Sequence, residues 1–278
     1  MAYGLTLDQV RRTNRPTPQK KSWGSVTSLT EMEEYAMVRV VIEAGCAQPL
    51  HFFPSEYRAF VESGEVVVRG LDSLGGSLSG TARAGEVLPL PRFHVHGFAS
   101  VAGVVVYLFG PRSAEGLPGI PVETEEAAAS AFGALDFLEL RPLGQPTEDV
   151  REKYWGRIET ILSGEVAAKR IFVVKGGQSS LEYHVEKRES YYIHSGLLRV
   201  GLRIGRAENR SIVMEAGESY DVKPGVMHMR IGLEDTVILE VSTRDSDADS
   251  YLVEDGMSYH HIDADFNSES TQRQEQPK

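Results

Sequence analysis

Residues 177–196 have the sequence GQSSLEYHVEKRESYYIHSG, and the polar side chains in this stretch decide the fold of the 278-residue chain. Side chains two residues apart on a β-strand point to the same face, so Glu182 and His184 project together. A four-residue turn at 185–188 leads into a second strand, whose first residue, Glu189, can reach the same place. The stretch therefore predicts two neighbouring strands that bring three metal-binding groups together.

A histidine farther along the chain completes this group. The turn at Pro224-Gly225 precedes His228 and places its imidazole on a later strand. Two imidazoles with two carboxylates suit Mn, Fe, Zn, Co or Ni ions. A single histidine on a strand is usually an ordinary core or surface residue, but this combination at this spacing rarely arises by chance. We therefore expect one divalent transition metal ion with four ligands: Glu182, His184, Glu189 and His228.

The same order of glycine, histidine and proline signals occurs in both halves of the chain. In the first half the signals are Gly45, His51, Gly64, Gly85, Pro91 and His96. In the second half they are Gly177, His184, Gly196, Gly217, Pro224 and His228. A repeated order of this kind indicates a tandem duplication of one structural module.

Most of the remaining sequence predicts β-structure. Short runs of alternating or β-branched residues are separated by Gly, Pro, Asp and Ser, as is typical of all-β sandwiches and barrels. The Ala- and Glu-rich stretch 123–137 favours a short helix, and the prolines and glycine that follow it mark a boundary. We expect an N-terminal domain at 1–140, a linker at 141–151, a C-terminal domain at 152–265 and a disordered tail at 266–278.

The spacing of these residues resembles the two sequence motifs of the cupin superfamily. Residues 177–196 fit the first motif, with Glu182 in a position that is usually His or Gln, and residues 217–228 fit the second. The segments Tyr154-Trp155-Gly156 and Lys169-Arg170-Ile171 are similar to the C-terminal cupin domain of type II mannose-6-phosphate isomerases. The resemblance implies an all-β bicupin of two tandem jelly-roll barrels with a short connecting helix, and it implies the same four metal ligands.

The first half departs from this pattern. Phe53 and Tyr57 occupy two positions that hold ligands in the second half. One alternative is a three-histidine site of His51, His94 and His96, which some cupin oxygenases use. We expect the other alternative, a degenerate barrel that has lost its metal and serves as a packing or dimer partner.

The resemblance and the site residues together predict a metal-dependent aldose-ketose isomerase or epimerase of a sugar phosphate. Glu182 or Lys187 is the expected catalytic base. Lys187 and Arg230 are expected to bind the phosphate, and Tyr191 to line the sugar pocket. Two alternatives remain open: an Fe(II)-dependent cupin dioxygenase or lyase, and a sugar-binding bicupin without catalytic activity.

Composition and charge disfavour several other classes. The 40 acidic residues outnumber the 29 Lys and Arg residues, and a net charge of -11 repels nucleic acids and anionic membranes. The single cysteine, Cys46, and an N-terminus without an apolar run favour a cytoplasmic location. We expect a small anionic substrate and no nucleic-acid or membrane partner, and a homodimer remains open.

Overall fold

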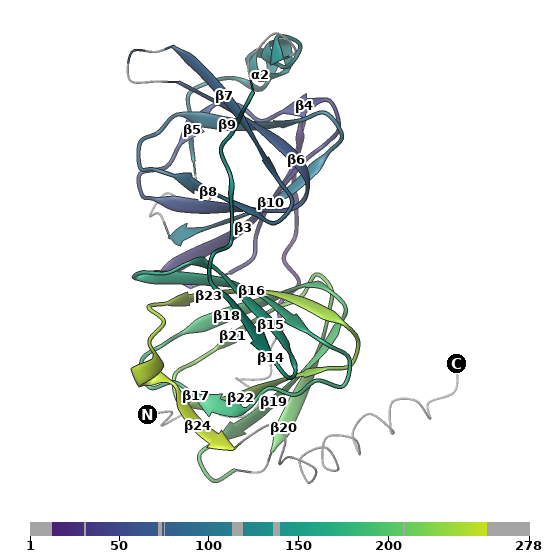
Figure 1. Cartoon of the computed structure of the whole chain (residues 1–278), viewed down its shortest axis with the longest axis vertical. Helices are drawn as coiled ribbons and strands as arrows, with labels where there is room; N and C mark the ends of the chain where they lie inside the picture. Colours follow the sequence, from purple (N-terminus) through teal and green to yellow (C-terminus); the bar gives the residue numbers. More distant parts are fainter. Residues whose placement is uncertain are drawn as a thin grey trace, which may run out of the picture. The chain divides into compact units, whose positions relative to one another are not determined.

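The computed structural model describes residues 13–30, 32–71, 74, 76–112, 119–135, 140–207 and 209–254, so the predicted tail at 266–278 lies outside the described residues. The chain divides into two compact units (Figure 1). The N-terminal unit is Pro16–Asp149 with Thr160–Leu162. The C-terminal unit is Met1–Arg15, Val150–Glu159 and Ser163–Lys278. Both units are built almost entirely of β-strands, which confirms the predicted all-β class.

The N-terminal unit is one curled sheet whose main strand order is β1-β2-β3-β10-β6-β9-β5-β11. The remaining strands pair with β6, β7, β8 and β9 off this path. Its strands are β1 Gln19–Lys21, β2 Gly24–Ser28, β3 Tyr35–Ile42, β4 Cys46–Ala47, β5 His51–Phe52, β6 Tyr57–Leu71, β7 Ser77–Arg83, β8 Glu86–Leu90, β9 His96–Ser100, β10 Val104–Pro111, β11 Ile120–Pro121, β12 Arg141–Pro142 and β13 Gln145–Pro146.

A short helix, α2 at Glu125–Phe132, lies within the stretch predicted to be helical. It begins after Thr124, whose side chain accepts a hydrogen bond from the backbone N–H of Ala127. Ala128 packs with Val67 and Ala99 of the N-terminal unit. The helix is therefore part of this unit's packing.

The segment 141–151, predicted as a linker, contains two strands and the start of a third. In it β12 pairs with β7 and β13 pairs with β8, so these residues extend the sheet of the N-terminal unit. At the other end of the chain, Asn14 forms a β-bridge with Ser219 of the C-terminal unit.

The C-terminal unit consists of two sheets. A six-stranded sheet has the order β14-β15-β16-β23-β18-β21, and a five-stranded sheet has the order β20-β19-β22-β17-β24. A buried apolar cluster that includes Ile171, Leu198 and Ile238 draws on strands of both sheets. The elements are β14 Val150–Lys153, β15 Gly156–Leu162, β16 Val166–Val173, β17 Leu181–Tyr183, β18 Glu189–Ser195, β19 Leu197–Ile204, β20 Arg210–Glu215, β21 Ser219–Val222, β22 Val226–Gly232, β23 Thr236–Thr243, the 3₁₀ helix η2 Asp247–Asp249 and β24 Tyr251–Glu254.

Two glycines at corresponding positions of the duplicated motif are required by the backbone. Gly64 has a φ of 82°, and a Cβ there would lie 2.4 Å from the carbonyl oxygen of Gly103. Gly196 has a φ of 89°, and a Cβ there would lie 2.2 Å from the carbonyl oxygen of Asp235. A side chain at either position would combine a disfavoured conformation with a steric clash.

None of the helices in the described ranges has both the length and the apolar character needed to cross a bilayer.

Candidate metal centre

Two adjacent strands of the five-stranded sheet position three metal-binding side chains. Glu182 on β17 is paired in register with His228 on β22, and His184 follows directly after β17. One ligand atom from each of these side chains lies within 4.8 Å of the other two. The structure thus brings together three of the four residues that the sequence singles out.

The two histidines present their Nε2 atoms to this group. Nδ1 of His184 bonds to the carbonyl oxygen of Asp249 at 2.8 Å, and Nδ1 of His228 to that of Val226 at 3.1 Å. Because a carbonyl can only accept, each Nδ1 carries a proton, so Nε2 is the atom that offers a lone pair whenever the ring is neutral. Nε2 of His184 is buried without a hydrogen-bond partner in the described part of the chain. The Nε2 atom is thus held in one orientation by the bond at Nδ1 and has no hydrogen-bond partner of its own, and both properties fit a metal ligand.

Glu189, the first residue of β18, is fully buried beside this group. Its Oε1 lies 2.8 Å from Nε2 of His228, and its Oε2 lies 3.8 Å from Nε2 of His184. Two lone-pair atoms at 2.8 Å require a cation, either a proton on the imidazole or a metal ion. Burial alone would raise the pKa of Glu189, but Lys187 and the two histidines hold it well below its usual range. Glu189 is therefore an ionised carboxylate and fits the predicted fourth ligand.

Lys187, in the turn between β17 and β18, is 4% exposed and points into the barrel. Its ammonium group lies 2.7 Å from Glu189 and 3.0 Å from each of Glu240 and Asp245. Burial alone would lower the pKa of Lys187, but these carboxylates raise it well above its usual value. All three N–H donors have carboxylate partners, so the geometry does not suit the predicted roles of base and phosphate ligand.

Arg230 lines the site two residues after His228. Its guanidinium group bonds to Glu240 at 3.2 Å and to Glu182 at 3.3 Å. Burial alone would raise the pKa of Glu182, but Arg230 and His228 together bring it below its ordinary value. Glu182 is thus an ionised side chain that Arg230 orients from one side.

Tyr191 is completely buried between Arg230 and Glu189. Its hydroxyl accepts a hydrogen bond from Arg230 at 2.7 Å and donates one to Glu189. It is not among the residues that line the cavity beside the ligand group. This position suits support of Glu189 and Arg230 and does not suit the predicted contact with a sugar.

The segment 245–250, between β23 and β24, supports the ligand group from a distant part of the sequence. The carboxylate of Asp249 accepts hydrogen bonds from the backbone N–H groups of the turn 185–187, at 2.8 to 3.0 Å for the closest contact of each. The Asp249 carbonyl oxygen is the partner of His184 described above. Sequence analysis missed Asp249 because no motif spacing links it to this turn.

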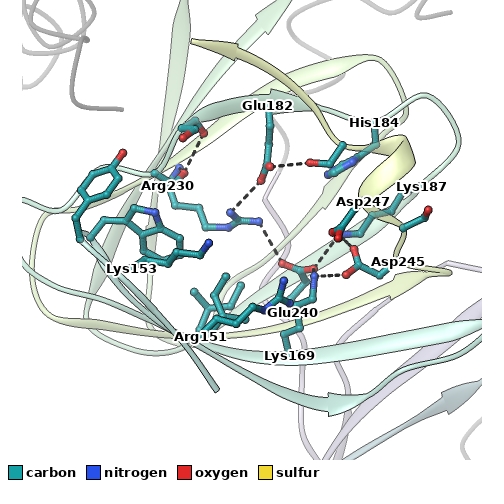
Figure 2. A pocket seen from close by; sticks show the side chains of 18 residues that line it. Arg151, Lys153, Lys169, Glu182, His184, Lys187, Arg230, Glu240, Asp245 and Asp247 are labelled. Carbon is teal, nitrogen blue, oxygen red and sulfur yellow. Dashed lines mark hydrogen bonds and ion pairs between the residues drawn. The ribbon is translucent and has the colours of Figure 1, made fainter. Parts of the chain in front are cut away.

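The ligand group opens on a cavity of about 300 Å³ (Figure 2). Arg151 and Lys153 on β14 line it together with Trp155. Because Arg151 and Lys153 are two residues apart on one strand, they share a face. Sequence analysis missed both, although the alternation in the segment VREK, at 150–153, carried the signal.

The corresponding part of the N-terminal unit holds a pair of histidines among aromatic rings. His51 and His96 are paired in register on β5 and β9, and their ring centroids are 4.5 Å apart. Phe53 and Tyr57 are buried beside them. Burial lowers the pKa of His51 to about 4, and burial together with His51 lowers the pKa of His96 to about 3.

His94 does not join this pair, because it is exposed in the turn before β9. The alternative of a site made of His51, His94 and His96 is therefore not assembled. In the described residues of the N-terminal unit, no three metal-binding side chains come within 4.8 Å of one another.

No family model and no curated protein matches the chain. Solved structures do match it. Oxalate decarboxylase of Bacillus subtilis, studied for its Mn(II) centres, has 17% sequence identity and a TM-score of 0.65, with 86% of this chain and 77% of that chain covered. The same enzyme at pH 4.6 gives 18% identity, a TM-score of 0.62, and 83% and 74% coverage.

The chain has the cupin fold. The two barrels of this bicupin architecture confirm the fold predicted from the sequence. At this level of identity the likeness concerns the fold alone, and the similarity to mannose-6-phosphate isomerases stays a prediction.

Proposed function

We propose that this bicupin is a metal-dependent enzyme that isomerises or epimerises a small hydroxylated anion, with a sugar phosphate as the substrate. The proposal depends on one observation: Glu182, His184 and His228 converge at the wall of a cavity that also carries basic side chains. A cavity of about 300 Å³ suits a small metabolite and excludes a polymer.

A divalent ion would be held by His184, Glu189 and His228, with Glu182 as the fourth ligand or a close neighbour. When bound, it would act as a Lewis acid that polarises the carbonyl and neighbouring hydroxyl oxygens of the substrate. The rest of the proposal concerns the side chains of the chain itself.

Glu182 is the residue to which we assign the transfer of a proton between adjacent substrate carbons. Its side chain is 24% exposed, in contrast to the fully buried Glu189, so it can reach a molecule in the cavity. It is ionised, and contacts from Arg230 and from the Ser250 hydroxyl at 3.2 Å orient its two oxygens. Lys187 and Tyr191 are positioning residues that hold Glu189.

A second candidate, a lyase that acts on a small carboxylate, is favoured by a different observation. Oxalate decarboxylases are among the solved structures that are similar in fold, and this similarity extends over 86% of the chain. The basic wall of the cavity would accept a dicarboxylate as well as a sugar phosphate.

Metal analysis of the purified full-length protein tests the common part of both candidates. We expect one divalent ion per chain after loading with Mn²⁺ or Fe²⁺, and none in the His184→Ala variant. The exposed His94 provides a matched control, because His94→Ala removes an imidazole outside the site. Normal metal content in His184→Ala would contradict the assignment.

Turnover then separates the candidates. Hexose and pentose phosphates are incubated in D₂O, where isomerisation or epimerisation incorporates deuterium next to the carbonyl. Oxalate and longer dicarboxylates are tested for CO₂ release, and oxygen uptake with Fe²⁺ tests the dioxygenase alternative. Binding of sugar phosphate without any conversion would contradict catalysis and support a sugar-binding bicupin.

A further inference from the structure

The turn that leads into β9 of the N-terminal unit repeats the turn that leads into β22 of the C-terminal unit. The backbone N–H of Phe93 donates a hydrogen bond to the carbonyl oxygen of Phe53 at 2.7 Å. The N–H of Gly225 donates to the carbonyl oxygen of His184 at the same distance. Phe53 and His184 hold the same position of the duplicated motif. Phe93 therefore stands where the C-terminal unit has a glycine.

Both residues have the left-handed backbone conformation. The φ angle is 78° at Gly225 and 61° at Phe93, and Phe93 is the only non-glycine residue with a positive φ among those that the structure describes. Glycine adopts this conformation freely, whereas a bulky side chain is strained in it. Strain of this kind clusters at sites where function requires it. The N-terminal unit thus keeps a phenylalanine where a glycine would be unstrained.

Burial of the ring does not explain why Phe93 is there. The residue is 56% exposed. Its ring centroid lies 6.1 Å from that of Phe52, and the guanidinium carbon of Arg92 lies 5.0 Å from it. Because an aromatic ring stabilises a fold in proportion to the area that it buries, a half-exposed ring contributes only part of its possible effect. A partner that covers the ring would supply the rest.

Phe93 belongs to a patch of apolar side chains at one edge of the N-terminal sheet. Phe52 follows the buried His51 on β5 and points to the opposite face. Ile120 on β11 is paired with Phe52, so the two side chains share this face. Val122, two residues further along, is 52% exposed. We call Phe52, Phe93, Ile120 and Val122 the edge patch, because β11 is the last strand on the main path of the sheet.

The charges around the edge patch favour a second copy of the chain as its occupant. With a net charge of -11, two copies repel each other wherever acidic surfaces approach. The segments that form the patch, 50–53, 91–94 and 119–122, contain no acidic residue. The exposed Arg92 at the rim can meet the acidic surface of the other copy. A twofold contact would set the same patch of each copy against the other, apolar side chains onto apolar side chains.

We propose that the edge patch is the interface between two copies of this chain and that Phe93 is the anchor of this interface. The left-handed backbone at Phe93 presents its ring to solvent, and dimerisation buries the ring against the apolar side chains of the other copy. The edge patch lies in the N-terminal unit, so a dimer formed there requires neither the metal centre nor the proposed reaction.

Analytical ultracentrifugation of the full-length protein tests the interface. We expect the parent to form dimers and Phe93→Ala to weaken dimerisation about tenfold or more. Tyr251→Ala removes an exposed aromatic ring from the C-terminal unit and is expected to dimerise like the parent. Because the apolar contact forms against the repulsion of two acidic chains, raising the NaCl concentration from about 0.05 M to about 0.5 M is expected to strengthen dimerisation.

A comparison of Phe93→Gly with Phe93→Ala tests the strain. Both variants lack the ring and are expected to be monomers, so urea unfolding compares the same oligomeric state. At an ordinary position glycine is less stable than alanine, because it loses more backbone entropy on folding. At position 93 we expect the reverse, a higher urea midpoint for Phe93→Gly, since glycine fits a φ of 61°. The same two substitutions at the exposed Val101, whose φ is not positive, are expected to show the ordinary order.

Three outcomes would overturn the proposal. A parent protein that stays monomeric at every protein and salt concentration would exclude the dimer. Dimerisation of Phe93→Ala with the affinity of the parent would place the interface elsewhere on the chain. A lower urea midpoint for Phe93→Gly than for Phe93→Ala would show that Phe93 is not strained and would remove the reason to regard it as an anchor.

Discussion

The ammonium group of Lys187 lies 2.7 Å from Oε2 of Glu189, and both side chains are almost inaccessible to solvent. Glu189 is the first residue of β18, and Lys187 lies two residues earlier, in the turn that leads into this strand. The turn that carries Lys187 therefore also fixes the carboxylate of Glu189. The same ammonium contacts Glu240 and Asp245. One buried cation thereby pairs with three carboxylates beside the candidate metal centre.

Removal of this cation is expected to destabilise the C-terminal unit. Lys187→Met would leave Glu189, Glu240 and Asp245 buried with less compensation, at a cost of about 3 to 5 kcal/mol. Urea unfolding followed by the fluorescence of Trp155, in the Trp23→Phe background, measures this cost. The exposed Lys175→Met is the control, and equal stability of the two variants would show that the buried pairs contribute nothing.

Asp249 is expected to act on metal affinity through His184 and the turn 185–187. Asp249→Ala removes the acceptor for three backbone N–H groups, while the carbonyl that bonds to His184 remains but is less well placed. Loss of a group that orients a ligand typically costs about 10-fold to 100-fold in metal affinity. Competition with a chelating dye for Mn²⁺ measures it. Asp249→Asn keeps one acceptor oxygen and is expected to lose less metal affinity than Asp249→Ala. An Asp249→Ala variant with the metal affinity of the parent would contradict this role.

Metal affinity is expected to fall as the pH falls, because a proton competes for Nε2 of His228. Burial alone would lower the pKa of His228, but Glu189 and Glu182 raise it above the usual 6.5. Competition therefore begins above pH 6.5 and strengthens at lower pH. Glu189→Gln removes the main cause of the raised pKa of His228. The metal affinity of this variant is expected to be weaker overall and to begin to fall only at a lower pH. Calorimetric titration with Mn²⁺ between pH 6 and 8 measures both proteins, and parallel profiles would refute this link.

The sequence predicted the parts of the site that depend on local periodicity. Glu182 and His184 share a face because they alternate along β17, and His228 meets Glu182 through the register of β17 with β22. The glycines at 64 and 196 follow from backbone geometry alone. The shared face of Glu182 and His184 is encoded within three neighbouring residues, and the place of His228 is indicated by the spacing of a second motif.

The features that sequence analysis missed depend on contacts between distant segments. Lys187 was predicted as a site residue, but its pairing with Glu240 and Asp245, more than 50 residues later, was not. Arg151 and Lys153 lie on a strand that the nearby prolines and glycine made resemble a linker. Asp249 caps a turn that precedes it by about 60 residues. No periodic sequence pattern predicts contacts between segments that are this far apart in the chain.

The histidine pair of the N-terminal unit is expected to make this unit sensitive to acid. The folded-state pKa of His51 is about 4 and that of His96 about 3, both below the usual 6.5. The unfolded chain therefore binds more protons below pH 6.5, so stability is full above that pH and is lost as the pH falls toward 3. For His51 alone the loss is on the order of 3 kcal/mol.

Unfolding of this unit is followed by Trp23, with Trp155→Phe as the background, at pH values from 7 to 4. A variant that carries both His51→Gln and His96→Gln removes the titrating groups, so its stability should change much less over this range. Because the aromatic residues Phe53 and Tyr57 fill the neighbouring ligand positions, the variant should also keep the metal content of the parent. Loss of metal or of turnover in a folded double variant would assign the working metal site to the N-terminal unit. If the stability of the double variant still depended steeply on pH, the groups responsible for the acid sensitivity would lie elsewhere.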